Sequence, residues 1–75
     1  MYYNFEFTLT VPQSWNYCPA DLMKKYAKEN ANVSYFHDWR AILVINGTKY
    51  KYNGWKIKTN NDGTETVTVY LVYLV

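Results

Sequence analysis

Four lysines between residues 49 and 58 are the side chains of this sequence best suited to a chemical task. If the strand alternation reverses once, at Asn53-Gly54, one sheet face carries all four: Lys49, Lys51, Lys56 and Lys58. A lysine surface on a twisted sheet can follow the phosphates of a nucleic acid. Arg40 is a further candidate for this surface. The sequence therefore offers a nucleic-acid-binding hypothesis.

The same lysines have a plainer interpretation, which is a solvated sheet face. Lysine also discourages unwanted pairing between sheet edges. The aromatic residues nearest to the lysines, Tyr50, Tyr52 and Trp55, are expected on the opposite face, where they cannot stack on bases beside phosphate contacts. The sequence alone therefore favours a solvated face over a nucleic-acid-binding one.

The aromatic residues form a second candidate surface. Nine tyrosines and three tryptophans exceed what the core of so small a chain can hold. Tyrosine and tryptophan are enriched at protein interfaces, although both also have a high intrinsic propensity for β-strands. The residues expected to stay partly exposed and to contact a partner are Tyr2, Tyr35, Tyr70 and Tyr73.

No set of residues indicates catalysis. Cys18 is the only cysteine, and its expected place is the start of a helix, as a small and partly buried side chain. His37-Asp38 is the only adjacent histidine–carboxylate pair, and neighbours in a strand point apart, so we interpret it as a turn. No cluster of metal ligands and no glycine-rich phosphate loop is present in the sequence. We expect a protein that is not an enzyme and needs no metal or cofactor.

Composition limits the chain to one small domain over residues 1–75. The apolar fraction of 49% and the aromatic fraction of 20% are those of a folded chain, and the net charge of +2 is too small to indicate a nucleic-acid binder by itself. A single cysteine and no signal-peptide pattern favour a cytoplasmic location. The longest apolar run, Val69 to Val75, is too short to span a membrane as a helix.

One helix is expected near the N-terminus, after a first strand. Residues 3 to 11 alternate between apolar and polar side chains, which predicts a strand whose tyrosine, phenylalanine, leucine and valine side chains share one face. Pro19 suits the first position of a helix, and Asp21 then complements the helix dipole. Leu22, Met23, Tyr26 and Ala27 would form the buried face of this helix.

The rest of the chain is predicted to be strands and turns. A short strand is a possibility at 33–36, and a stronger one is expected at 39–45. Asn46-Gly47 predicts a two-residue hairpin, and Asn61-Asp62-Gly63 a three-residue hairpin. Asn53-Gly54 is either another tight hairpin or a bulge in one long strand, and we prefer the bulge because two short strands would bury little.

These elements predict an α+β fold with a β-α-β-β-β order. About four antiparallel strands, with one further short strand as an option, should be covered on one face by the helix. The strand from residue 70 to the end is apolar on both faces, so it should be covered on both, by the chain itself or by a second copy in a homodimer. The expected core is Phe5, Phe7, Leu9, Leu22, Tyr26, Leu43, Trp55, Ile57, Val67, Val69 and Leu71.

The leading functional hypothesis is a small non-catalytic protein that docks on a larger protein and inhibits it. A phage-type inhibitor of a host defence enzyme, such as an anti-CRISPR protein, is one example that fits the size and the lack of catalytic residues. The alternative hypothesis is nucleic-acid binding through the lysine face. A homodimer is compatible with either hypothesis.

Overall fold

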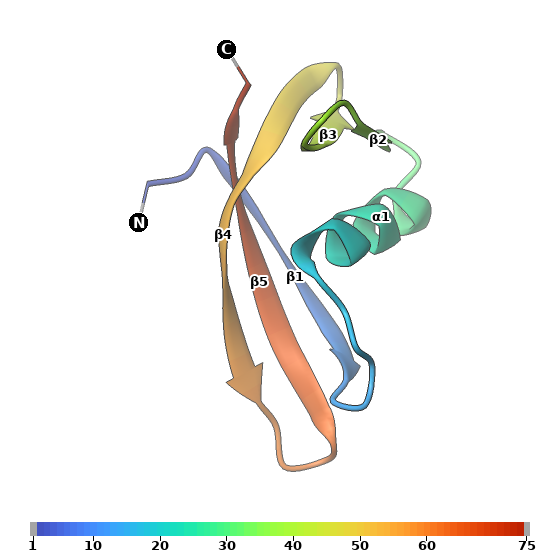
Figure 1. Cartoon of the computed structure of the whole chain (residues 1–75), viewed down its shortest axis with the longest axis vertical. Helices are drawn as coiled ribbons and strands as arrows, with labels where there is room; N and C mark the ends of the chain where they lie inside the picture. Colours follow the sequence, from blue (N-terminus) through green and yellow to red (C-terminus); the bar gives the residue numbers. More distant parts are fainter. Residues whose placement is uncertain (1, 75) are drawn as a thin grey trace.

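The computed structural model of this chain describes residues 2–74 and has an α+β fold. One five-stranded sheet runs in the order β1-β5-β4-β3-β2, and every neighbouring pair is antiparallel (Figure 1). The elements are β1 Phe5–Pro12, α1 Pro19–Glu29, β2 Val33–His37, β3 Ala41–Ile45, β4 Thr48–Thr59 and β5 Thr64–Tyr73. The fifth strand is β2, the short strand that the sequence offered as an option.

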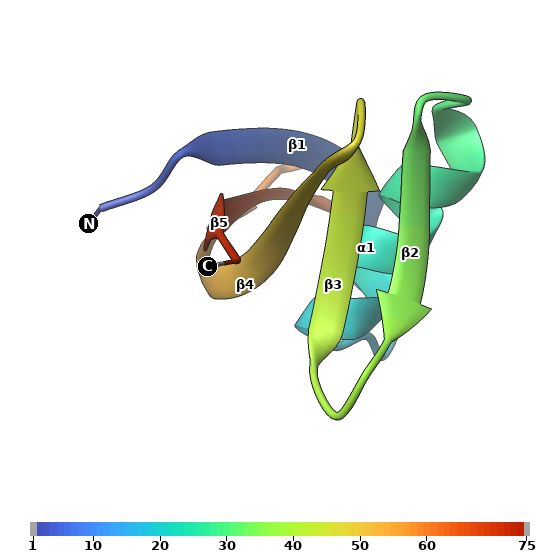
Figure 2. The ribbon, with the colours of Figure 1, turned by 90° about the horizontal axis from the view of Figure 1, so that it is seen from above.

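The sheet is strongly curled, and α1 lies against its inner face. In the view from above, β2 and β3 lie beside the helix and run across the direction taken by β1 and β5 (Figure 2). The long strand β4 joins these two parts of the sheet, since it pairs with β3 near its start and with β5 along its length. The sheet therefore has an inner face toward α1 and an outer face turned away from it.

The start of α1 follows the rules for helix capping. Pro19 is the first helical residue, and Cys18 is the N-cap with an extended backbone. The Asp21 carboxylate accepts a hydrogen bond of 2.9 Å from the backbone N–H of Cys18, and hydrogen bonding at Cys18 lowers the pKa of Asp21. Leu22 and Met23 are fully buried, so they attach the helix to the sheet.

The predicted turns set the register of the sheet. Asn46 and Gly47 have φ values of +50° and +84°, as a type I′ hairpin requires. Gly63 also has a φ of +84°, in the three-residue loop between β4 and β5. Ile57 pairs with Val67 and Lys58 with Thr66, which is the register that the predicted three-residue hairpin at Asn61-Asp62-Gly63 produces.

The bulge in β4 is confirmed. The register between β4 and β5 shifts between Tyr52 and Gly54, which leaves Asn53 as the extra residue. Gly54 has a φ of +137°, a conformation that side-chain-bearing residues rarely adopt. The extra residue reverses the alternation, so Trp55 follows Tyr52 onto the inner face and the later lysines share the outer face with the earlier ones.

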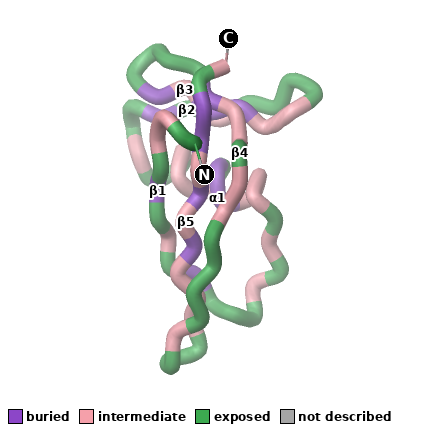
Figure 3. Tube along the Cα trace, turned by 90° about the vertical axis from the view of Figure 1, so that its left-hand side faces the viewer, coloured by how far each residue is buried: buried purple, intermediate pink, exposed green. Residues whose placement is uncertain are grey.

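The core lies between α1 and the inner face. Leu22, Leu43, Val67, Val69 and Leu71 are fully buried there, while four other expected members pack on the core only partly buried: Phe5, Leu9, Tyr26 and Trp55. The expectation for Ile57 is wrong, because its side chain is 43% exposed. The helix contacts β1, β2 and β3, and the far half of β4 extends beyond its cover, as the exposed stretch in Figure 3 shows.

The strand β5 is covered on both faces for part of its length, as predicted. Leu71 is buried on the inner face and Val72 on the outer face. On the inner face the cover comes from this chain, because Leu71 belongs to the same core cluster as Leu22 and Met23 of α1. At its edges, β5 lies between β1 and β4. A homodimer in which a second copy pairs with β5 as a strand is therefore excluded, since both edges of β5 are already hydrogen-bonded. Val75 lies outside the described residues.

Candidate nucleic-acid interface

The four lysines of β4 form a single row on the outer face. Across the sheet, Lys58 lies opposite Thr66, Lys56 opposite Thr68, Lys51 opposite Val72, and Lys49 opposite Val44. With a strand rise of about 3.3 Å per residue, the row from Lys49 to Lys58 extends for roughly 30 Å. We call Lys49, Lys51, Lys56 and Lys58 the lysine row. The bulge at Asn53 is the reason that all four belong to one face.

Among residues 2–74, the lysine row has no acidic ion-pair partner. The one ion pair within residues 2–74 joins Lys25 and Glu29 of the helix, at 3.0 Å. Among the strand residues of the outer face, only Glu6 is acidic, and it pairs across the sheet with Tyr70. Glu65, the other glutamate of the sheet, is turned to the inner side, where its carboxylate accepts a hydrogen bond from Tyr17. The outer face is thus a positively charged surface.

Aromatic side chains from other segments accompany the lysines on this face. The aromatic residues of β4 do point to the inner face, but other strands supply different ones. Tyr70 points outward from β5, and Tyr3 packs against it with ring centroids 5.0 Å apart. Phe36 of β2 lies opposite Ile42, with the Lys49 Nζ 6.0 Å from the centre of its ring.

Tyr3 reaches the outer face because β1 begins later than predicted. The strand starts at Phe5, and Asn4 forms a bend before it. Tyr3 is therefore not part of the inward alternation that begins at Phe5, and a hydrogen bond with Glu6 raises the pKa of Tyr3. Asn4 fits the polar positions of the alternation, so no local pattern in the sequence indicates that Tyr3 takes the outer face.

A band of apolar side chains crosses the outer face at Lys51. The register places Lys51 directly between Ile42 and Val72, which are only 3% and 8% exposed although they face away from the helix. Long lysine stems commonly cover apolar neighbours while the charged end stays in water. Phe36 continues the band onto β2. In this part of the face the positive charge therefore lies next to one exposed apolar ring, that of Phe36.

The residues predicted to contact a partner divide between the two faces. Tyr2, 71% exposed, and Tyr70 lie on the outer side. Tyr35 lies opposite the core residue Leu43 and near Lys24 of the helix, and Tyr73 packs on Tyr50, so both belong to the inner side. The four tyrosines therefore do not form one surface.

Arg40 lies in the turn between β2 and β3, apart from the lysine row. Its guanidinium stacks on Trp39, 3.9 Å from the ring centre. Trp39 is 78% exposed and has a φ of +52°, which is unusual for a residue with a side chain. The strand expected at 39–45 begins only at Ala41, so Trp39 lies in the turn and its exposure results from the turn geometry.

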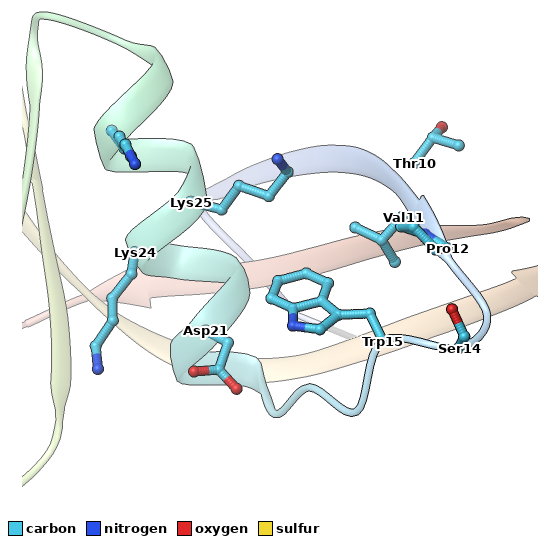
Figure 4. A pocket seen from close by; sticks show the side chains of 9 residues that line it. Thr10, Val11, Pro12, Ser14, Trp15, Asp21, Lys24 and Lys25 are labelled. Carbon is cyan, nitrogen blue, oxygen red and sulfur yellow. The ribbon is translucent and has the colours of Figure 1, made fainter.

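A larger hollow of about 710 Å³ lies between α1 and the loop that follows β1 (Figure 4). Val11 and Trp15 line it on one side, and Lys25 extends over it from the helix. Lys25 is paired with Glu29, the Asp21 carboxylate is held by Cys18, and the Lys24 side chain points away from Trp15. Lys28 also lines this hollow, and within residues 2–74 neither Lys24 nor Lys28 has an ion-pair partner, so the hollow carries positive charge. We place the candidate site on the outer face because four lysines gather there on one surface with the rings of Tyr3, Tyr70 and Phe36.

The residues considered for catalysis lie in ordinary structural positions. Cys18 is the exposed N-cap of α1. His37 ends β2 with its Nδ1 3.4 Å from the Tyr35 hydroxyl, and Asp38 begins the next turn by donating its N–H to the carbonyl of Arg40. Over residues 2–74, no three histidine, cysteine or acidic side chains group as metal ligands.

Residues 2–74 include no helix that is long and apolar enough to cross a membrane. Comparisons with protein-family models, with curated proteins and with solved structures found no significant match for this chain. The candidate interface is therefore argued from its own geometry and chemistry.

Proposed function

We propose that this chain is a non-catalytic nucleic-acid-binding protein and that the outer face of its sheet is the binding surface. The observation that carries the proposal is the lysine row, whose four lysines have no ion-pair partner in the described part of the chain and share a face with Tyr3, Tyr70 and Phe36. Lysines contact phosphates without regard to sequence, and exposed aromatic rings stack on bases. The length of the row, about 30 Å, suits a strand of about four or more nucleotides.

The salt dependence of binding tests this proposal. If the whole lysine row contacts a single strand, each contact contributes about 0.7 to the slope of log affinity against log salt, giving a total near 2.8. The affinity of a labelled oligonucleotide, measured by fluorescence anisotropy, should then fall about 50-fold between roughly 50 and 200 mM salt. Replacing all four lysines with glutamine should abolish this dependence and leave folding intact, since exposed charges contribute little to stability.

The helix supplies a control with matched charge. Lys24 and Lys28 are exposed on α1, which lies on the other face of the sheet. The double variant Lys56→Gln/Lys58→Gln should lower the slope by about 1.4, whereas Lys24→Gln/Lys28→Gln should leave it unchanged. Equal effects of the two double variants would show that net charge, and not the outer face, determines binding. An absence of binding by the wild-type chain would refute the proposed function.

Docking on a larger protein is a second candidate function, favoured by Trp39. A tryptophan that is 78% exposed and stacked on an arginine combines two residue types that dominate binding energy at protein interfaces. Inhibition of the docked protein, of which an anti-CRISPR protein would be one form, stays a prediction from the sequence. Capture from a native cell extract, with and without nuclease, separates the candidates: a partner that survives nuclease and is lost with Trp39→Ala supports docking.

A further inference from the structure

A second, smaller hollow lies on the outer face beside the bulge in β4. This hollow has a volume of about 380 Å³, and its lining residues are Tyr2, Asn4, Lys51, Asn53, Val72 and Tyr73. Lys51 and Val72 lie opposite each other across β4 and β5, so the hollow lies within the length of the lysine row. Its size is at the lower end of the range for small-molecule pockets, about 300 to 1,000 Å³. It suits one planar ring better than a longer chain segment.

The hydrogen bonds around the hollow determine which polar atoms remain free. The Nδ2 of Asn53 donates to the backbone carbonyl of Tyr2 at 2.7 Å. A carbonyl can only accept, so the amide orientation of Asn53 is fixed, and no donor among residues 2–74 is bonded to its Oδ1. Asn53 therefore presents a free acceptor beside the hollow.

The side-chain amide of Asn4 holds the N-terminal segment through both its oxygen and its nitrogen. The Oδ1 of Asn4 accepts the backbone N–H of Tyr73 at 2.8 Å, and the Nδ2 of Asn4 donates to the Tyr2 hydroxyl at 3.0 Å. The Tyr2 hydroxyl thus accepts from Asn4 and keeps its own proton for another partner. Together with the bond from Asn53, these contacts place an exposed tyrosine ring at the rim of the hollow.

These groups match the parts of a nucleotide. The Tyr2 ring offers a stacking face, and the buried Val72 offers an apolar floor. The Asn53 Oδ1 accepts a hydrogen bond and the Tyr2 hydroxyl can donate one, which suits the mixed donor and acceptor edge of a nucleobase. The Lys51 ammonium supplies a charge for the attached phosphate.

We propose that this hollow holds one unstacked nucleobase of a single strand bound along the lysine row. This inference rests on the proposed function and names its substrate class, because a base in a duplex must first be unpaired and unstacked before it can enter a pocket. The protein therefore prefers single strands to duplexes. A free mononucleotide contacts the hollow but not the rest of the lysine row, and it binds more weakly than a strand.

The test compares one sequence as a single strand and as a duplex, together with the free mononucleotide. Tyr2 is 71% exposed and precedes β1, so Tyr2→Ala should keep the melting temperature of the wild type. This variant should weaken single-strand binding about tenfold, the effect of losing one base–aromatic stack. Its duplex affinity and its salt slope should not change. Tyr2→Phe, which retains the ring, should restore most of the affinity.

Two further measurements show whether the effect of Tyr2→Ala is specific to the hollow. Trp39→Ala removes another exposed aromatic ring that does not line the hollow, and it should leave single-strand binding unchanged. An oligonucleotide with 2-aminopurine at successive positions should show a fluorescence change at one position that is lost with Tyr2→Ala. Equal wild-type affinity for single strand and duplex, with no effect of Tyr2→Ala while the lysine variants abolish binding, would overturn the base pocket but keep the proposed function. If neither form of the nucleic acid binds, both proposals fail.

Discussion

At the scale of single residues, the contact between Tyr17 and Glu65 links the loop before the helix to β5. The Tyr17 hydroxyl donates to the Glu65 carboxylate at 2.5 Å, and the Tyr17 ring packs edge-on against Trp55. Desolvation, followed by the hydrogen bond and the charge of Glu65, raises the pKa of Tyr17 to about 12 from the usual 10.0. The folded chain therefore holds this proton more tightly than the unfolded chain does.

This raised pKa predicts a loss of stability in alkaline solution. A group with a raised folded-state pKa contributes its full stabilisation below the unfolded pKa of 10.0, and the contribution is lost as pH rises through about 12. Tyr17→Phe should reduce the free energy of unfolding at neutral pH by about 1 kcal/mol, because the hydrogen bond is lost. Between these two pH values the variant should lose less stability than the wild type.

Urea denaturation of both chains at neutral pH and across the alkaline range measures this difference. Tyr3 and Tyr52 also have raised pKa values, but both variants retain them, so the difference between the chains isolates Tyr17. Parallel alkaline losses in the two chains would show that Tyr17 does not couple its proton to folding.

At the scale of elements, the bulge in β4 connects the fold with the candidate site. If Asn53 paired as a regular strand residue, alternation would place Lys56 and Lys58 on the inner face and turn Trp55 outward. Deletion of Asn53 alone removes the extra residue and leaves Gly54 opposite Tyr70, so the faces stay as they are. Deletion of Asn53 together with Gly54 brings Trp55 opposite Tyr70 and reverses the faces, so it should greatly reduce the free energy of unfolding, which for a chain of this size is only about 4 to 11 kcal/mol. Circular dichroism during urea titration measures the effect.

The control for this deletion retains the chain length. Asn53→Gly keeps the extra residue and removes only the side chain, so this variant should unfold cooperatively with a midpoint close to that of the wild type. If the variant without Asn53 and Gly54 unfolded at the wild-type midpoint, the result would contradict the role of the bulge in keeping the lysines away from the core face.

The same elements show what the sequence could and could not predict. The turns at Asn46-Gly47 and Gly63 and the bulge at Asn53 were predictable, because a positive φ or an added residue leaves a local signal in asparagine and glycine. Strand order has no such signal, so the central place of β5 was not predictable. Ile57 is exposed because α1 does not reach the far half of β4. The position of α1 over the sheet depends on tertiary packing, which no local pattern predicts.

Prediction of the candidate site was limited by the same long-range effects. The lysine row follows from alternation within one strand and was correctly assigned to one face. Its aromatic companions come from other segments: Tyr3 from the residues before β1, Tyr70 from β5 and Phe36 from β2. Only pairing between distant segments brings them together, so the alternation within β4 did not predict these aromatic neighbours.

At the scale of the whole molecule, the fold places the core on one face of the sheet and the proposed binding surface on the other. The inner face and α1 hold nearly all of the buried apolar side chains, and the outer face presents the lysine row, Tyr3 and Tyr70. The edges are β1 and β2, while the apolar strand β5 is enclosed between neighbours. A chain of 75 residues thus keeps a stable core and still leaves one broad face for a partner.

The most direct test of the proposed binding surface is an amide chemical-shift map of the chain, titrated with a short single-stranded oligonucleotide. We expect the largest shifts at Lys51, Lys56 and Tyr70 and in the segment that contains Tyr2 and Tyr3, with saturation at one strand per chain. The amides of α1 from Lys24 to Lys28 should change little. Shifts concentrated on α1 or around Trp39, or no shifts at concentrations that saturate known single-strand binders, would contradict the assignment of the outer face as the nucleic-acid-binding surface.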